Sequence, residues 1–188
     1  MRSKKAAMEL SISTIVVIVL AMSMLIFGLI LIKNIFAAGQ NAIKMTDDQL
    51  SNELSKMYGA ELKLGVYPNS KQIEVVLGKQ GAFGVGIKNL RSGSTANTKF
   101  SYEVEVSDSR VEEKCGSGYS AEYMMALISV GESETDISIA TGETYVTRVM
   151  FEPPTGGPLC TVRFRVTAKV NNEVYGSPQN MDVTFRSS

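Results

Sequence analysis

The sequence predicts a mainly β protein, an antiparallel β-sandwich preceded by an N-terminal transmembrane helix and a short connecting helix. Three observations lead to this prediction. The stretch from Leu10 to Ile32 contains no charged residue, a helix-capping pattern begins at Thr46, and beyond Leu62 apolar residues alternate with polar ones. We therefore divide the chain into an N-terminal segment with the transmembrane helix and stalk (1–45), a connecting helix (46–61) and an extracytoplasmic β-sandwich domain (62–188).

The uncharged stretch from Leu10 to Ile32 has the length that a helix needs to cross the hydrocarbon core of a membrane. Arg2, Lys4 and Lys5 precede it, and Asp47 follows soon after it. Basic residues flanking a transmembrane helix stay on the cytoplasmic side. We therefore expect a single-pass protein of the cell membrane, with its N-terminus in the cytoplasm and its C-terminal domain outside.

The connecting helix has a start signal of its own. The sequence Thr46-Asp47-Asp48-Gln49 has the spacing of a capping box, in which the first and last side chains bond each other's backbone N–H groups. Leu50, Leu54 and Met57 then recur at helical spacing and form one apolar stripe. Gly59 is placed to end the helix. We expect this helix to pack on the β domain, because the stripe is too short for a coiled coil.

Beyond the connecting helix, the apolar residues recur at every second position, as in half-buried strands. The clearest alternations predict strands at 83–87, 100–106, 145–151, 160–170 and 181–185. Asn171-Asn172 reads as a turn, and Gly176-Ser177-Pro178 breaks the chain before the last strand. Several short strands separated by turn clusters, without a long helical pattern, favour an antiparallel sandwich.

Two cysteines, Cys115 and Cys160, both lie in the part of the chain that is predicted to be outside. Thiols in oxidising surroundings usually pair. We predict a disulfide between them, and the alternative is two separate buried thiols.

Several kinds of chemistry are excluded by composition. The chain has no histidine, which rules out Ser-His-Asp and Cys-His catalysis and the common zinc sites. The formal net charge is zero, so no basic face for nucleic acid is expected. No phosphate-binding glycine motif occurs. We expect no enzyme, no cofactor, no small-molecule substrate and no nucleic-acid partner. A carboxylate-dependent surface hydrolase is the one enzymatic class left open.

Alternating acids at Glu132, Glu134 and Asp136 offer a candidate cation site. Carboxylates together with backbone carbonyls could hold calcium, which takes six to eight oxygen ligands. The alternative is a solvated turn without a ligand.

Two loops are candidates for recognition, since loop tips on a rigid sandwich can make contacts without straining the core. They are Cys115–Ser120 and the proline- and glycine-rich tip Pro153–Pro158. The alternative is a loop tethered by the disulfide and a rigid turn.

Lys4-Lys5-Ala6-Ala7 stands directly before the apolar segment, with Glu9 at the start of the helix. This arrangement resembles the class III signal peptide of type IV pilin-like proteins, especially archaeal ones. The resemblance implies a cut between Ala6 and Ala7 that leaves the helix on the mature protein. Ala6 stands where many of these proteins have glycine, and Glu9 would be the third mature residue where bacterial pilins have glutamate at the fifth. A plain membrane anchor, or a secretory signal cut at Ala37-Ala38-Gly39, are the alternatives.

The segments Gly81–Leu90 and Cys160–Phe185 are similar to strands of bacterial and archaeal immunoglobulin-like adhesion and surface domains. Together with the N-terminus, the chain resembles minor pilin-like and archaellum-associated envelope proteins. The resemblance implies a non-enzymatic cell-envelope protein, a pilin-like or minor filament subunit with an outward interaction domain. Its partners would be membrane lipid and envelope proteins, with like subunits as one candidate. The alternative is a permanently anchored adhesion or surface-layer-binding domain.

Overall fold

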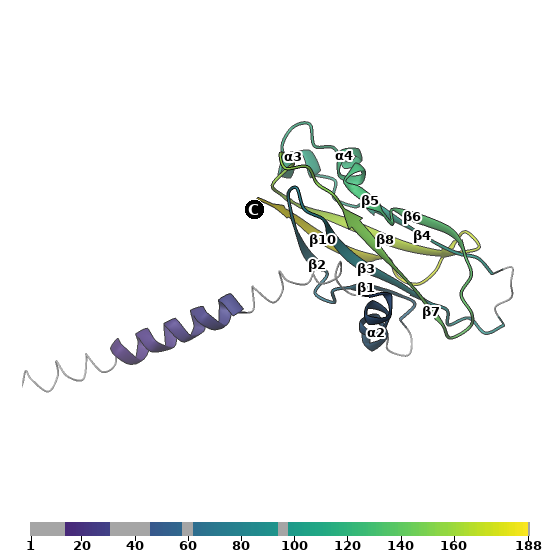
Figure 1. The fold of residues 1–188 in the computed structure, drawn as a ribbon, viewed down its shortest axis with the longest axis horizontal. Coiled ribbons are helices and arrows are strands. Elements are labelled where there is room, and N and C mark those ends of the chain that lie inside the picture. The colour runs from purple at the N-terminus through teal and green to yellow at the C-terminus, as the bar shows by residue number, and fades with distance from the viewer. Residues whose placement is uncertain (1–13, 31–45, 58–61, 94–97, 188) are drawn as a thin grey trace, which may run out of the picture. The chain divides into compact units, whose positions relative to one another are not determined.

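The computed structural model describes residues 14–30, 46–57, 62–93 and 98–187 (Figure 1). The chain divides into two units, Met1–Ile35 and Phe36–Ser188. In the first unit, residues 14–30 form a helix. Across the described ranges, no helix has both the length and the apolar character needed to cross a membrane. Ala6, Ala7, Glu9 and the two ends of the predicted helix Leu10–Ile32 lie outside the described residues.

The first described element of the second unit is helix α2 (Asp47–Met57), which starts where the capping pattern predicts. The Thr46 N–H donates to Gln49 Oε1 at 3.0 Å, and the Gln49 N–H donates to Thr46 Oγ1 at 3.3 Å. This reciprocal pair is the predicted capping box. The predicted end of the helix at Gly59 lies outside the described residues.

The rest of the unit is mainly β and forms two sheets, as the sequence predicts. One sheet has the strand order β1 (Leu64–Tyr67), β3 (Gly81–Lys88), β7 (Thr144–Phe151), β5 (Ile128–Val130). The other has the order β2 (Gln72–Val76), β10 (Gln179–Arg186), β8 (Thr161–Val170), β4 (Phe100–Val106), β6 (Ser133–Ile137), and β9 (Glu173–Val174) pairs with β8. Two short helices, α3 (Val111–Cys115) and α4 (Ala121–Ala126), follow β4.

The expectation of a wholly antiparallel sandwich is wrong at one pair of strands. β2 runs parallel to β10, in register from Gln72 opposite Asp182 to Val76 opposite Arg186. β1 belongs to the first sheet and β2 to the second, so the chain changes sheets between them and β2 lies beside the last strand. The alternation of apolar and polar residues indicates which face of a strand is buried. It does not indicate whether the neighbouring strand runs parallel or antiparallel.

The core lies between the two sheets and is centred on Phe151. The ring centroid of Phe151 lies 5.1 Å from that of Phe164 in the opposite sheet, and 5.9 Å and 6.1 Å from those of Phe83 and Phe185. All four side chains are at most 1% exposed. Tilted and edge-on ring contacts of this kind add to the energy of burial.

Helix α2 covers the outer face of the first sheet, where it contacts β1, β3 and β7. Leu50 and Leu54 are fully buried there, as the apolar stripe predicts, while the side chain of Met57 lies outside what the structure describes. Gly84 makes room for the helix, since a Cβ at this position would lie 2.6 Å from Leu50 Cδ1. β3 was expected to be half-buried, and it is buried on both faces because α2 packs on its outer side.

Candidate functional site

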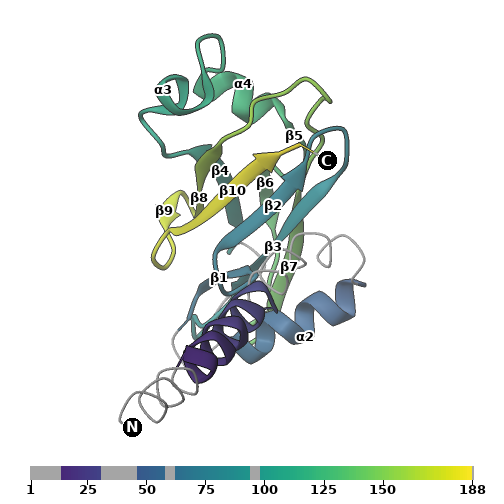
Figure 2. The same cartoon turned by 90° about the vertical axis from the view of Figure 1, so that its left-hand side faces the viewer.

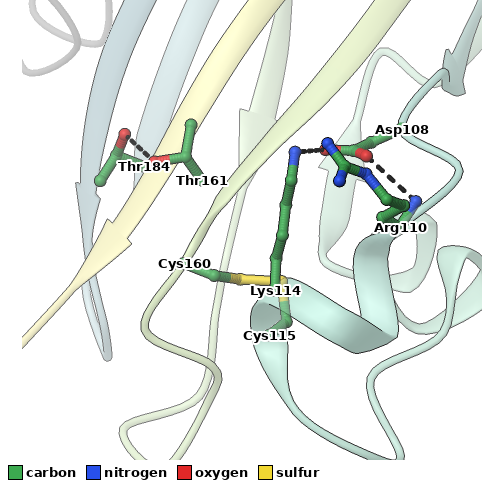
Figure 3. Close-up of a disulfide and its surroundings, with 7 residues drawn as sticks. All are labelled: Asp108, Arg110, Lys114, Cys115, Cys160, Thr161 and Thr184. Atoms are coloured by element: carbon green, nitrogen blue, oxygen red, sulfur yellow. Dashed lines mark hydrogen bonds and ion pairs between the residues drawn. A yellow bond between two sulfur atoms is a disulfide. The ribbon is translucent and has the colours of Figure 1, made fainter.

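The predicted disulfide is present and joins α3 to the start of β8. Cys115 is the last residue of α3, and Cys160 stands directly before β8, with the two Cα atoms 5.2 Å apart. Both cysteines pack against the core. For Cys160 this agrees with the prediction that it continues the inward-facing residues of β8. The bridge therefore fixes α3 against the end of the sandwich (Figure 3).

Asp108 organises the approach to α3. One carboxylate oxygen accepts the Arg110 backbone N–H at 3.1 Å, and the other accepts the Lys114 ammonium (Figure 3). The hydrogen bond from Lys114, followed by that from the Arg110 N–H, lowers the pKa of the Asp108 carboxyl below its ordinary value. These bonds hold the charged form of Asp108 in place.

An open polar hollow of about 460 Å³ lies beside the disulfide, lined by Asp108, Arg110, Lys114, Thr161, Arg163 and Asp182 among others. Two ion pairs lie among its charged side chains, and Arg110 adds a further positive charge. Lys114 pairs with Asp108, and Arg163 pairs with Asp182 through two bonds of 2.7 Å and 2.9 Å. The hydroxyl groups that line the hollow belong to a chain that has no histidine to activate them. The hollow thus offers polar and charged contacts.

The outer face of the second sheet is covered by cross-strand ion pairs. They are Arg186–Glu74, Arg163–Asp182, Arg165–Glu105 and Lys169–Glu103. Pairs this exposed contribute little to stability, but they keep the face hydrated and balanced in charge. This face is a poor candidate for binding an ion of either sign.

The two predicted recognition loops meet each other. The Tyr119 hydroxyl donates to the Gly156 carbonyl at 3.4 Å, and the Tyr119 and Tyr123 rings pack edge to face with centroids 5.0 Å apart. The Gly78 N–H also donates to the Pro153 carbonyl at 2.8 Å. We call this composite surface, formed by residues 116–123, 153–159 and 77–80, the tip.

The tip lies on the side of the domain away from α2, with α3 and α4 beside it (Figures 1 and 2). Leu159 is 62% exposed on it. Because the disulfide and the hydrogen bonds fix its loops, the tip presents aromatic and aliphatic groups in a defined arrangement. No pattern in the sequence predicts that the two loops meet. They are far apart in the sequence, and the arrangement of the strands brings them together.

In the described residues, the alternating acids Glu132, Glu134 and Asp136 are not gathered into a cluster. The stretch taken as a loop contains strand β6, and only Glu134 of the three acids has a specific partner, accepting the Tyr145 hydroxyl. Burial, and then the bond to Glu134, raise the pKa of the Tyr145 hydroxyl above its ordinary value. In the part of the chain that is described, no cluster of His, Cys, Asp or Glu side chains is placed to hold a metal ion.

Comparisons with known proteins show no family for this chain. No protein-family model matches the sequence, and no curated protein matches it. Among solved structures, the chain is similar to the Pseudomonas fluorescens alkylpurine DNA glycosylase AlkC, bound to DNA that contains an abasic site analog. The identity is 16% and the TM-score 0.33, over 70% of this chain and 32% of that one. A likeness of this size carries no argument about fold or function.

Proposed function

We propose that this is a non-enzymatic cell-envelope protein, a pilin-like or minor filament subunit that is held by its N-terminal helix and presents the β domain outward. The observation that carries the proposal is the apolar surface of helix 14–30. Its large apolar side chains are between 47% exposed, at Ile18, and 77% exposed, at Met24. A helix that is apolar on all sides needs a cover, which lipid or the helices of like subunits would supply.

The polar groups of this helix fit that setting. The Ser23 hydroxyl donates to the Val19 carbonyl at 2.8 Å, so its hydrogen bond is satisfied within the helix itself. Inside a bilayer every polar group must be satisfied without water. The uncharged sequence also extends beyond the helix on both sides, from Leu10 to Ile32.

The β domain fits an extracytoplasmic site. Its cysteines form a disulfide, which persists in oxidising compartments. The basic residues that precede the helix would remain in the cytoplasm. The absence of histidine favours a binding role over an enzymatic one.

The strand order supports an immunoglobulin-like sandwich, the fold that the sequence resemblance implies. In such domains, strands A, B and E share one sheet and strands C, F and G the other. Here β1, β3 and β7 correspond to A, B and E, and β4, β8 and β10 to C, F and G. The disulfide differs from the usual one, which joins B to F across the core, because it joins α3 to the start of β8.

A permanently anchored surface-binding domain is the second candidate. It is favoured by Ala6, which stands where many pilin-like signals have glycine, and by the position of Glu9. In that case the same helix would hold the domain to the membrane without processing or assembly.

Membrane extraction of the full chain tests the common part of the two candidates. The protein should stay in the membrane at alkaline carbonate and leave it only in detergent. Ile18→Lys combined with Leu25→Lys should release it, because each lysine costs about 3 kcal/mol at the middle of a bilayer. Val130→Lys combined with Leu159→Lys, at exposed apolar sites of the β domain, is the control and should leave it bound. Release of the unaltered protein by carbonate would refute the proposal.

A further inference from the structure

Strand β7 has an edge that is only partly paired. On one side, β3 pairs with it along its whole length, from Thr144 to Phe151. On the other side, β5 pairs only with Met150 and Phe151. Within the described residues, the earlier part of β7 has no neighbouring strand on that side.

The direction of the backbone groups identifies what this edge presents. A Cβ on Gly131, which directly follows β5, would lie 2.1 Å from the Arg148 carbonyl oxygen, so that carbonyl points toward β5. The Glu152 N–H likewise points that way, since it donates to the Leu127 carbonyl at 2.9 Å. Residues at every second position of an antiparallel strand face the same side. Thr144 and Val146 therefore direct their N–H and C=O groups to the open edge.

The edge is open because the chain turns away from it. At Gly131 the backbone has φ 81°, and the chain leaves the first sheet to form β6 in the second. β6 is itself a poor template, since its pairing with β4 shifts register and Asp136 has φ 60°. Natural proteins use such irregularities to block unwanted strands. β7 has no irregularity of this kind in its pairing with β3.

Negative charge lies beside the open edge. The carboxylate of Glu134, on β6, accepts a hydrogen bond from the Tyr145 hydroxyl on β7. The Glu134 carboxylate therefore lies between β6 and β7. Glu132 and Asp136 on the same segment and Glu143 directly before β7 are exposed. Lys99 lies on the β6 side, where its ammonium donates to the Ser138 hydroxyl at 2.9 Å. Arg148 lies on β7 itself. An added strand with Lys or Arg opposite Glu134 would be attracted, and an acidic strand repelled.

We propose that the open edge of β7 accepts an extended, Lys- or Arg-bearing segment of a protein partner as an additional strand, which bonds the backbone of Thr144 and Val146. Main-chain bonds supply the affinity in this mode of recognition, and the side chain opposite Glu134 supplies the selectivity. The inference goes beyond the proposed function, because it depends on neither the membrane anchor nor processing of the N-terminus.

Amide hydrogen exchange on the detergent-solubilised full chain tests the inference. The probes are two short synthetic peptides, one in which valine alternates with lysine and one in which valine alternates with glutamate. The lysine peptide should slow exchange at Thr144 and Val146 by about tenfold or more, because their N–H groups become hydrogen-bonded. The glutamate peptide should leave both unchanged. Unchanged exchange with the lysine peptide at saturation would overturn the inference.

Two pairs of variants separate the roles of backbone and charge. Val146→Pro removes the edge donor at a position where a sheet tolerates proline, and should abolish binding of the lysine peptide. Val146→Thr, the matched control, keeps the donor and should bind as before. Glu134→Gln should weaken binding about fivefold or more, whereas Glu122→Gln on α4 should not change it. Equal binding of the lysine peptide by the proline and threonine variants would overturn the inference. If the proline variant does not fold, the comparison of Glu134→Gln with Glu122→Gln still tests the role of charge.

Discussion

Asn89 is a fully buried polar residue that ties together loops distant in the sequence. Its side-chain amide donates to the Ile139 carbonyl at 2.8 Å and its side-chain carbonyl accepts the Arg91 N–H at 3.0 Å. Its backbone N–H donates to the Glu143 carbonyl at 2.9 Å. One side chain therefore fixes the turn after β3 against the loop before β7.

Replacing Asn89 with alanine should lower the free energy of unfolding by about 2 kcal/mol, because buried groups lose their hydrogen-bond partners. Asn180→Ala, at an exposed position of β10, is the control and should change it by less than about 0.5 kcal/mol. Urea unfolding measures both. An equal loss in the two variants would show that the buried bonds of Asn89 do not matter.

Asp108 should make the stability depend on pH on the acid side. Its side chain is 10% exposed, and its pKa is lower in the folded chain than in the unfolded chain. Its contribution is therefore complete above the unfolded value of about 3.8 and is lost as the pH falls through the folded value. Asp108→Asn should cost about 1 kcal/mol at neutral pH, since Lys114 is partly exposed.

The difference between the unaltered protein and Asp108→Asn should shrink as the pH is lowered below about 3.8, the ordinary value of this pKa. Urea unfolding at neutral and acid pH measures it. Glu173→Gln, on the exposed strand β9, is the control for a general loss of negative charge. A difference that stays constant down to low pH would contradict this role of Asp108.

Among the elements, those with a strong local pattern were predictable. The capping residues Thr46 and Gln49 located the start of α2, and the alternation at 160–170 located β8, whose inward residues are buried. Asn171 and Asn172 adopt φ 50° and 71° in the turn after β8, as expected for asparagine. In each case the signal lies within a few neighbouring residues.

Elements without such a pattern were missed. β6 reads as a loop because four of its five residues are exposed, so no apolar alternation marks it. β1 and β5 are too short for a period to appear, and α3 has only one buried residue, Val111. The parallel pairing of β2 with β10 depends on the whole topology, which no local pattern contains.

The features of the candidate site also fall into those that the sequence predicted and those that it did not. The cysteine pair and two of the three segments of the tip were found by composition, through Cys115, Cys160 and the glycine- and proline-rich stretches, whereas residues 77–80 were not predicted to join them. The bond from Tyr119 to Gly156 and the open edge of β7 join residues that only the fold brings together. Sequence alone could not supply either.

Helix α2 and β3 should be energetically coupled through Leu50 and Gly84. Leu50→Ala should cost about 2–5 kcal/mol, because it empties a fully buried position. Gly84→Val should cost about 1–3 kcal/mol, because its side chain displaces Leu50. The double variant should lose at least about 1 kcal/mol less than the sum, because the smaller alanine leaves room for valine.

Urea unfolding of the four proteins gives this coupling. Gly156→Ala is the glycine control, since no heavy atom lies within 4 Å of the added Cβ, and it should change stability by less than about 0.5 kcal/mol. Additive losses at Leu50 and Gly84 would contradict the packing of α2 against β3.

At the scale of the whole molecule, the disulfide reduces the conformational entropy of the unfolded chain. Cys115 and Cys160 are 45 residues apart, and a cross-link of this span stabilises a protein by about 4 kcal/mol in the chain-entropy relation. Replacing both by alanine should lower the free energy of unfolding by about 2–4 kcal/mol. Thermal unfolding measures this, with the reduced unaltered protein as the control. A variant as stable as the oxidised protein would show that the bridge contributes nothing.

The whole chain joins an apolar N-terminal helix to a β domain whose tip and open β7 edge are suited to protein contacts. The pilin-like proposal accounts for both parts. The helix would hold the protein in the membrane and, after removal of the leader, would pack against the helices of like subunits. That step leaves a chemical trace, because a cut between Ala6 and Ala7 keeps the helix and removes only the residues before it.

The most direct test is the intact mass of the protein purified from its own membranes. The account predicts a mature chain that begins at Ala7, which is the result of prepilin-type processing. A chain that still begins at Met1 would contradict the pilin-like proposal and leave a permanently anchored binding domain. A chain that begins near Gln40 would contradict membrane attachment itself and make the protein a secreted one.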